Sequence, residues 1–142
     1  MWHQAGFMKT VLFVPILIMS LFLPPTICAY DEARATANLA SDFAQCSAFY
    51  TLSAEGIRRT GDEKLIIRFM EASKKAYDYS AKYSNETVSE ARIELALDEQ
   101  RKEIGYNCSN FVILILKYGE MCKDALNSPK KKLQYWLDRK DE

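Results

Sequence analysis

The chain has 142 residues, and its 19 lysine and arginine residues balance 19 aspartate and glutamate residues, so the formal net charge is zero. This balance gives no electrostatic reason to expect nucleic acid or an anionic membrane as a partner. With only 5 glycines and 4 prolines, the composition also disfavours a fold built from short strands and tight turns.

The first predicted element is a secretory leader. Lys9 precedes an apolar run at 11–23, and small residues follow near Ala29, which is the order typical of a signal peptide. As a helix, this run would span only about 20 Å of a hydrocarbon core of about 30 Å. We therefore expect a signal peptide at 1–29, a secreted or periplasmic location, and no stable membrane anchor after cleavage. Met8 already opens a complete signal, so it is an alternative start to Met1.

Cleavage after Ala29 leaves residues 30–142, which are enough for one small domain with its own core. The first helix is predicted over 31–59. Apolar side chains at helical spacing define its buried stripe: Leu39, Phe43, Cys46, Tyr50 and Ile57. Beside the stripe, a row of alanines between Ala33 and Ala48 leaves a shallow surface where another backbone can approach closely.

Two further helices follow. Asp62 is placed to cap a helix over 62–84, whose buried residues are predicted to be Leu65, Ile66, Phe69, Ala76 and Tyr83. Thr87, with a glutamate three residues later, forms a capping-box pattern. This pattern predicts a third helix over 87–104.

The segment Phe111–Tyr118 contains six consecutive apolar residues and is compatible with a buried strand or a helix. We expect a helix over 108–126, because no other segment offers a partner strand and a lone strand leaves its backbone groups unpaired. Its buried stripe is predicted to be Phe111, Ile115, Tyr118 and Cys122. A fifth helix begins at Pro129 with Ser128 as its cap, and it carries Leu133, Trp136 and Leu137 on one side.

Four long helices with short connections predict an all-α fold. The expected architecture is an up-down-up-down four-helix bundle closed by a short fifth C-terminal helix. No repeat or linker interrupts residues 30–142, so we expect a single helical domain. The basic segment 128–140 is expected to pack over the open end of the bundle; the alternatives are a membrane surface or a partner protein.

The cysteines predict one disulfide. An exported chain meets an oxidising compartment, which favours a bridge among Cys46, Cys108 and Cys122. Cys108 and Cys122 would lie about 21 Å apart on one helix, and a bridge requires Cα atoms within about 7 Å. Cys46 lies about 18 Å from the end of the first helix, and Cys122 lies about 21 Å from the start of the fourth at that same end. Because their levels match, we predict the disulfide Cys46–Cys122.

Cys108 is then the odd cysteine. We expect it to be a buried small residue, and the alternative is an intermolecular disulfide that makes a homodimer. If the leader is retained, Cys28 restores an even count and becomes a second candidate partner for Cys108.

The only histidine, His3, leaves with the leader. The mature chain then lacks the commonest general base near neutral pH and every Ser-His or Cys-His nucleophile pair. It also has no Cys-x-x-Cys and no phosphate-cradling glycine motif. The sequence therefore predicts no catalytic, metal-binding or cofactor-binding residues, no cofactor, and a protein that is not an enzyme.

By elimination, the expected function is that of an exported interaction factor whose partner is another protein. Examples of this class are an inhibitor, an immunity-type protein and an envelope accessory protein. A second hypothesis is a carrier whose bundle encloses a small apolar ligand among Phe43, Tyr50 and Tyr118.

A third hypothesis is a hydrolase that uses carboxylates. Glu90, Glu94 and Asp98 are spaced to share one helix face, as acid and base groups must. The same spacing is found on any solvated helix face, and we expect these residues to lie on the charged outer surface.

Overall fold

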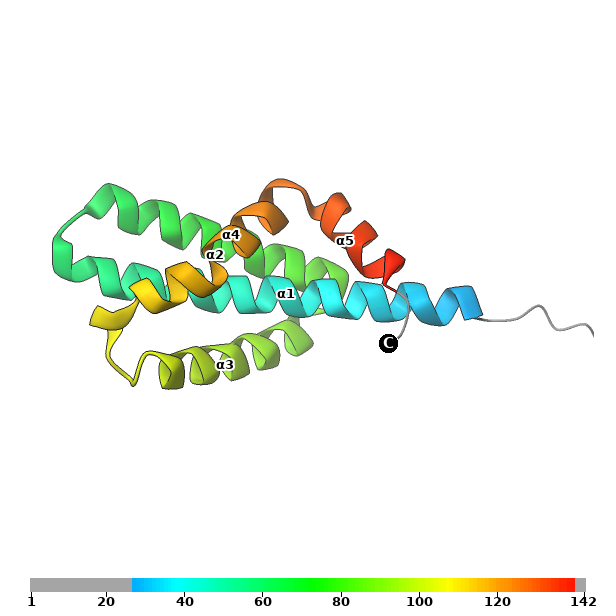
Figure 1. The fold of residues 1–142 in the computed structure, drawn as a ribbon, viewed down its shortest axis with the longest axis horizontal. Coiled ribbons are helices and arrows are strands. Elements are labelled where there is room, and N and C mark those ends of the chain that lie inside the picture. Colours follow the sequence, from blue (N-terminus) through cyan, green and yellow to red (C-terminus); the bar gives the residue numbers. More distant parts are fainter. Residues whose placement is uncertain (1–26, 140–142) are drawn as a thin grey trace, which may run out of the picture.

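The computed structural model describes the backbone of residues 27–139 and the side chains of residues 32–139. Within this range all regular elements are helical (Figure 1). They are α1 (Ile27–Ile57), α2 (Glu63–Tyr83), α3 (Glu86–Glu103), α4 (Val112–Asn127) and α5 (Pro129–Asp138), with 3₁₀ turns at Arg58–Thr60 and Cys108–Asn110. The predicted all-α bundle with a short C-terminal helix is confirmed. The choice of a helix for the apolar run before Tyr118 is confirmed as well.

The bundle is organised around α1, which contacts every other α-helix. In Figure 1, α2 and α3 run along opposite sides of α1, α4 crosses in front of it, and α5 lies on the same side as α2 with its end against α1. The chain reverses direction from α1 to α2, again to α3 and again to α4, which is the expected up-down-up-down order. Because α2, α3 and α4 touch one another much less than they touch α1, the position of each depends mainly on α1.

The main hydrophobic core lies against the predicted stripe of α1. Leu39, Phe43 and Cys46 are fully buried, and Ile57 is nearly so, while Tyr50 is half-buried. From the rest of the chain, the side chains that complete this core are Ala76, Ile104, Leu114, Cys122, Ala125 and Leu126. The stripe that the helical spacing predicts is therefore the surface on which the other helices assemble.

A second buried surface of α1 consists of small residues. Of the predicted alanine row, Ala40, Ala44 and Ala48 are buried, whereas Ala37 is partly buried and Ala33 is exposed. The helices packed against α1 also bury mostly small residues: α2 buries Ser73, Ala76 and Ser80, and α3 buries Ser89 and Ala96 together with Gln100. Small residues on facing helices allow the backbones to approach closely.

Serine hydroxyls replace apolar contacts at this surface. Ser80 Oγ donates to the backbone carbonyl of Ala40 at 2.9 Å, and Ser73 Oγ donates to the carbonyl of Ser47 at 3.0 Å. The hydroxyls of Ser80 and Ser89 also lie 3.0 Å apart, which connects α2 to α3. The hydroxyls of Ser73, Ser80 and Ser89 thereby have partners, so their burial does not carry the cost of an unsatisfied polar group.

The helix ends agree with the prediction at α2 and differ from it at α3. The carboxylate of Asp62 accepts a hydrogen bond from the backbone N–H of Leu65 at 3.0 Å, so Asp62 caps α2. At α3 the cap is Asn85 and not Thr87, because Asn85 Oδ1 accepts from the N–H of Val88 at 2.9 Å. Asparagine is the stronger N-cap of the two, and α3 therefore begins at Glu86.

The start of the fourth helix also differs from the prediction. Cys108–Asn110 form a separate 3₁₀ turn, and α4 begins only at Val112. The reason is local: Asn107 Oδ1 accepts from the N–H of Ser109 at 3.0 Å, which stabilises a turn before the helix.

The predicted leader lies largely outside the described residues, which begin at Ile27. The expected cut after Ala29 falls inside the first turn of α1, so cleavage there would remove the first three residues of this helix. Among residues 27–139, no helix combines the length and apolar character that crossing a membrane requires.

Candidate protein-docking surface

The first half of α4 exposes a cluster of apolar side chains to solvent. Val112, Ile113, Ile115 and Leu116 are all exposed, Leu116 to 83% of its surface. We call these four residues the α4 apolar face. They account for four of the eleven exposed large hydrophobic residues in the described part of the chain, and they lie within five consecutive positions. This density distinguishes them from single exposed residues such as Leu95 on α3, which are ordinary on protein surfaces.

The apolar face results from the way α4 rotates against the core. Leu114, Tyr118 and Cys122 are spaced four residues apart and point inward, and Leu114 is fully buried. The predicted stripe placed Ile115 in the core, but Ile115 is 36% exposed. A helix packed on one side buries only part of its circumference, so an apolar run of six must leave several members in solvent.

Gly119 lies on α4 next to the apolar face. A Cβ at this position would meet only Ile115 Cγ2, at 3.7 Å, and the turn of helix around it leaves room for a side chain. A glycine inside a helix costs about 0.5–1 kcal/mol relative to alanine. Among the described residues, no packing contact requires a glycine at position 119.

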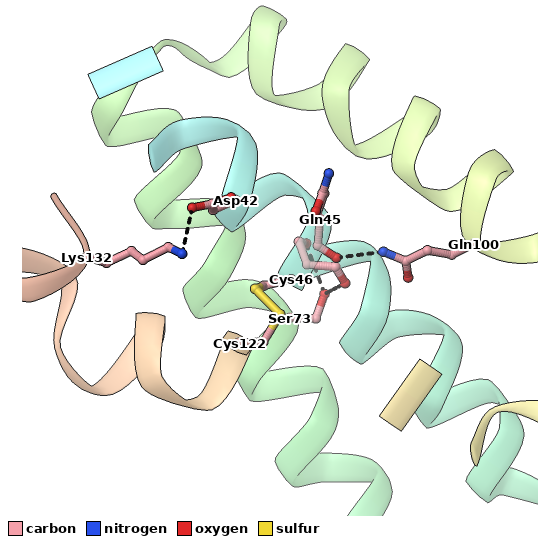
Figure 2. The surroundings of a disulfide bond; sticks show 8 residues. Asp42, Gln45, Cys46, Ser73, Gln100, Cys122 and Lys132 are labelled. Carbon is pink, nitrogen blue, oxygen red and sulfur yellow. Dashed lines mark hydrogen bonds and ion pairs between the residues drawn. A yellow bond between two sulfur atoms is a disulfide. The ribbon is translucent and has the colours of Figure 1, made fainter. Parts of the chain in front are cut away.

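The disulfide Cys46–Cys122 fixes α4 to α1, as the axial levels predict (Figure 2). The Cα atoms are 5.3 Å apart, and both cysteines are fully buried. At the other end of α4, the ring of Phe111 lies against Gly56 of α1. The apolar face is therefore carried by a helix that is held at its start and in its second half.

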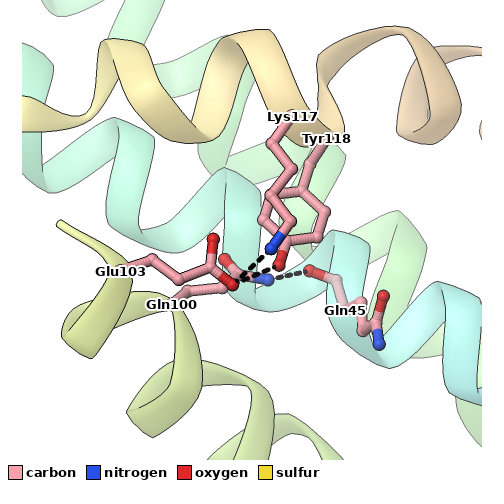
Figure 3. A network of polar contacts seen from close by, with 5 residues as sticks. All are labelled: Gln45, Gln100, Glu103, Lys117 and Tyr118. Carbon is pink, nitrogen blue, oxygen red and sulfur yellow. Dashed lines mark hydrogen bonds and ion pairs between the residues drawn. The ribbon is translucent and has the colours of Figure 1, made fainter.

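A polar network holds α4 to the end of α3 (Figure 3). Glu103 Oε1 accepts hydrogen bonds from Lys117 Nζ at 2.6 Å and from the hydroxyl of Tyr118 at 2.8 Å. The hydrogen bond to Glu103 raises the pKa of Lys117 above its usual value. The pKa of Tyr118 is also raised, mainly by burial and to a smaller extent by its hydrogen bond to Glu103. Nearby, Gln100 Nε2 donates to the backbone carbonyl of Gln45 at 3.0 Å, which ties α3 to α1.

Cys108 is the free cysteine of the described residues and is half-buried. Its Sγ lies 3.7 Å from Glu55 Oε2. It therefore retains some contact with solvent, in the turn that precedes the α4 apolar face. Sequence reasoning expected this thiol to be buried, but it is only half-buried, and the alternative of an intermolecular disulfide stays a prediction.

The aromatic residues proposed to line a ligand cavity pack against other rings. Phe43 stacks on Tyr79 with centroids 4.9 Å apart, and Phe49 contacts both Tyr50 and Tyr118 at 4.7 and 6.3 Å. These distances are those of paired aromatic side chains in a core. The arrangement gives the carrier hypothesis no support.

The carboxylates proposed for hydrolysis lie on the exposed side of α3, as expected. Asp98 forms an ion pair with Lys102, one helical turn away, at 2.6 Å. Glu90 accepts a hydrogen bond of 3.4 Å from Tyr77, and with Glu94 it lines an open pocket of about 410 Å³ between α2 and α3. Among the described residues no group of three or more acidic, histidine or cysteine side chains is arranged to hold a metal ion.

The C-terminal helix packs on the bundle, as predicted. Leu133 and Trp136 contact the core, whereas Leu137, which was assigned to the same stripe, is exposed. The ten-residue helix is held by its polar contacts to α1: Trp136 Nε1 donates to Asp42 Oδ2 at 2.7 Å, and Lys132 lies 3.3 Å from the same oxygen. These contacts draw Trp136 inward and leave the end of the helix in solvent.

The fold and this surface together define an all-α bundle that presents an exposed apolar face on a disulfide-anchored helix. No protein-family model, curated protein or solved structure matches the chain. The functional argument therefore rests on the geometry of the described residues.

Proposed function

We propose that the protein is an exported factor that acts by binding another protein through the α4 apolar face. The observation that carries the proposal is the exposure of Val112, Ile113 and Leu116 on one rigidly held helix. Monomeric soluble proteins rarely expose large contiguous apolar patches. Where such a patch occurs, it often marks a site of interaction with another protein. Export is supported by the leader-like sequence at 1–29 and by the disulfide.

The partner contributes an apolar helix. Gly119 leaves a notch beside Ile115 and Leu116, and a small residue at a helix surface lets a second helix backbone come close. Apolar side chains of the partner helix would then fill the space between Leu116 and Gly119. Burying a leucine side chain contributes about 1.5–3 kcal/mol, so loss of the Leu116 contact should weaken binding about 10- to 100-fold.

The test compares two variants of the exported protein as bait in the extracellular or envelope fraction of its native source. Leu116→Glu places a charge in the α4 apolar face, and Leu95→Glu places the same charge at an exposed leucine on α3. We expect the wild type and Leu95→Glu to retain one stoichiometric partner, and Leu116→Glu to lose it. Circular dichroism checks that both variants stay helical.

Two outcomes contradict the proposal. Equal capture by Leu116→Glu and Leu95→Glu would show that the partner binds elsewhere. A wild-type protein that sediments as a dimer, with Leu116→Glu as a monomer, would show that a second copy of the chain covers the face instead of a different protein.

A further inference from the structure

Two tripeptides of the chain have the pattern Asn-x-Ser/Thr with a residue other than proline in the middle. They are Asn85-Glu86-Thr87 and Asn107-Cys108-Ser109. This pattern is the acceptor for N-linked glycosylation in exported proteins. The pattern is short and arises often by chance, so the placement of each asparagine decides whether it can serve.

Both asparagines lie in connections between helices. Asn85 stands between α2 and α3, and Asn107 stands between α3 and the 3₁₀ turn that precedes α4. Both side chains are exposed, and so are the residues next to them at 86–88 and 105–106. A glycan is bulky and hydrophilic, so it requires this kind of site.

The two amide groups are also oriented for modification. Asn85 Oδ1 accepts from Val88 N–H, and Asn107 Oδ1 accepts from Ser109 N–H, at 2.9 and 3.0 Å. Each oxygen is thus bound to the chain, and no hydrogen bond to another described residue engages either Nδ2. Asn110 differs in both respects. Its Nδ2 donates a hydrogen bond to the carbonyl of Ile104 at 3.2 Å, and the residues after it do not complete the acceptor pattern.

We propose that Asn85 and Asn107 carry N-linked glycans. In the transfer, Nδ2 forms a bond to the anomeric carbon of an oligosaccharide carried on a polyprenyl diphosphate. The bond from that carbon to the diphosphate oxygen breaks, polyprenyl diphosphate leaves, and Nδ2 gives up one proton. Because Oδ1 is unchanged, the glycosylated side chains keep both hydrogen bonds described above.

The inference rests on the proposed export, and it makes that proposal more specific. The compartment that oxidises Cys46 and Cys122 must also supply a lipid-linked oligosaccharide and its transferase, which is the chemistry of a eukaryotic secretory lumen. The two sites lie at opposite ends of α3, whose 18 residues span about 27 Å. One glycan would therefore stand at each end of this helix.

The experiment expresses the full chain in a eukaryotic secretory host and measures the mass of the protein in the medium. Treatment with a glycan-removing amidase leaves aspartate wherever a sugar was attached, so peptide mapping identifies the sites. We expect Asp at 85 and 107. Thr87→Ala and Ser109→Ala should each remove one glycan and leave the asparagine caps intact, Thr87→Ser should retain it, and Asn110→Gln should change nothing.

The contrary outcomes are distinguishable. A protein that reaches the medium with its leader removed but at its bare polypeptide mass would refute the glycosylation and leave the export standing. A chain that stays inside the cell with its leader attached would refute export and, with it, this inference. A sugar that persists in the Thr87→Ala, Ser109→Ala double variant would refute the assignment of the sites.

Discussion

Gly56 of α1 lies directly against the ring of Phe111, at the start of α4. A Cβ at Gly56 would come within 2.5 Å of Phe111 Cδ1 and within 2.7 Å of the carbonyl oxygen of Cys108. One of these neighbours is backbone, so it cannot move aside as the end of a flexible side chain can. The absence of a side chain at Gly56 thus determines how closely the turn before α4 approaches α1.

The first prediction compares the glycines of α1 and α4. Gly56→Ala forces the turn at Cys108 and the Phe111 ring away from α1 and should lower the free energy of unfolding by about 1–3 kcal/mol. Gly119→Ala meets no close neighbour and should raise it by about 0.5–1 kcal/mol. Urea unfolding followed by circular dichroism measures both. A neutral Gly56→Ala would mean that Phe111 does not pack as described.

The second prediction concerns the disulfide. Cys46 and Cys122 are 76 positions apart, and removal of a native disulfide from a small domain costs about 2–5 kcal/mol. The double variant Cys46→Ala, Cys122→Ala should therefore lose most of its stability, and a reducing agent should destabilise the wild type comparably. Cys108→Ala is the matched control and should change the unfolding midpoint little. Non-reducing peptide mapping should recover the Cys46 to Cys122 link; a link that includes Cys108 would contradict the structure.

The pairing of Cys46 with Cys122 was predictable because it depends only on helix length and direction. A rise of 1.5 Å per residue and antiparallel neighbours are enough to place two residues at one level. The rotation of α4 about its axis was not predictable in the same way. Leu114 and Ile115 are equally apolar, so hydropathy does not distinguish them, and only the packing of Phe111 and Cys122 selects the buried one.

The buried serines were missed for a related reason. Ser73 and Ser80 are polar by composition, so a search for apolar periodicity assigns them to the surface. Both contact backbone carbonyls of α1 and are buried. The signal that would have found them is the spacing of small residues: Ser73, Ala76 and Ser80 follow the helical period opposite the alanine row of α1.

The third prediction is a pH dependence that arises from Tyr118. Burial and the hydrogen bond to Glu103 raise the pKa of Tyr118 above its usual value of 10.0. A raised pKa means that the folded state holds the proton more tightly, so this contribution is complete below about pH 10 and is lost as the pH rises through the folded-state value. The stability advantage of the wild type over Tyr118→Phe should therefore shrink as the pH rises above about 10.

Urea unfolding of both proteins across this range is the measurement. Tyr135→Phe, at an exposed tyrosine, is measured alongside as the control for removing a phenol hydroxyl. Tyr50, whose pKa is also raised by burial, is present in all three proteins and contributes equally. A difference between wild type and Tyr118→Phe that does not vary with pH would contradict the assignment.

The fourth prediction concerns the environment of Trp136, the only tryptophan after residue 29. Trp136 donates its indole N–H to Asp42, and Asp42→Ala leaves that donor unpaired and also removes the ion pair with Lys132. The change should cost about 1–3 kcal/mol and loosen α5 from α1. Trp136 fluorescence should then shift to longer wavelength while the helical content stays nearly constant. Asp138→Ala, on the exposed side of the same helix, should leave the emission unchanged.

The fifth prediction separates two buried serines. Ser80 Oγ has two partners, the carbonyl of Ala40 and the hydroxyl of Ser89, whereas Ser53 Oγ is equally buried and has no hydrogen-bond partner among the described residues. Ser80→Ala removes a satisfied donor and should lower the free energy of unfolding by about 1 kcal/mol. Ser53→Ala removes an unsatisfied polar atom and should be neutral or stabilising. Chemical unfolding of the two variants side by side is the measurement, and equal changes in the free energy of unfolding would mean that the hydrogen bonds of Ser80 do not distinguish it from Ser53.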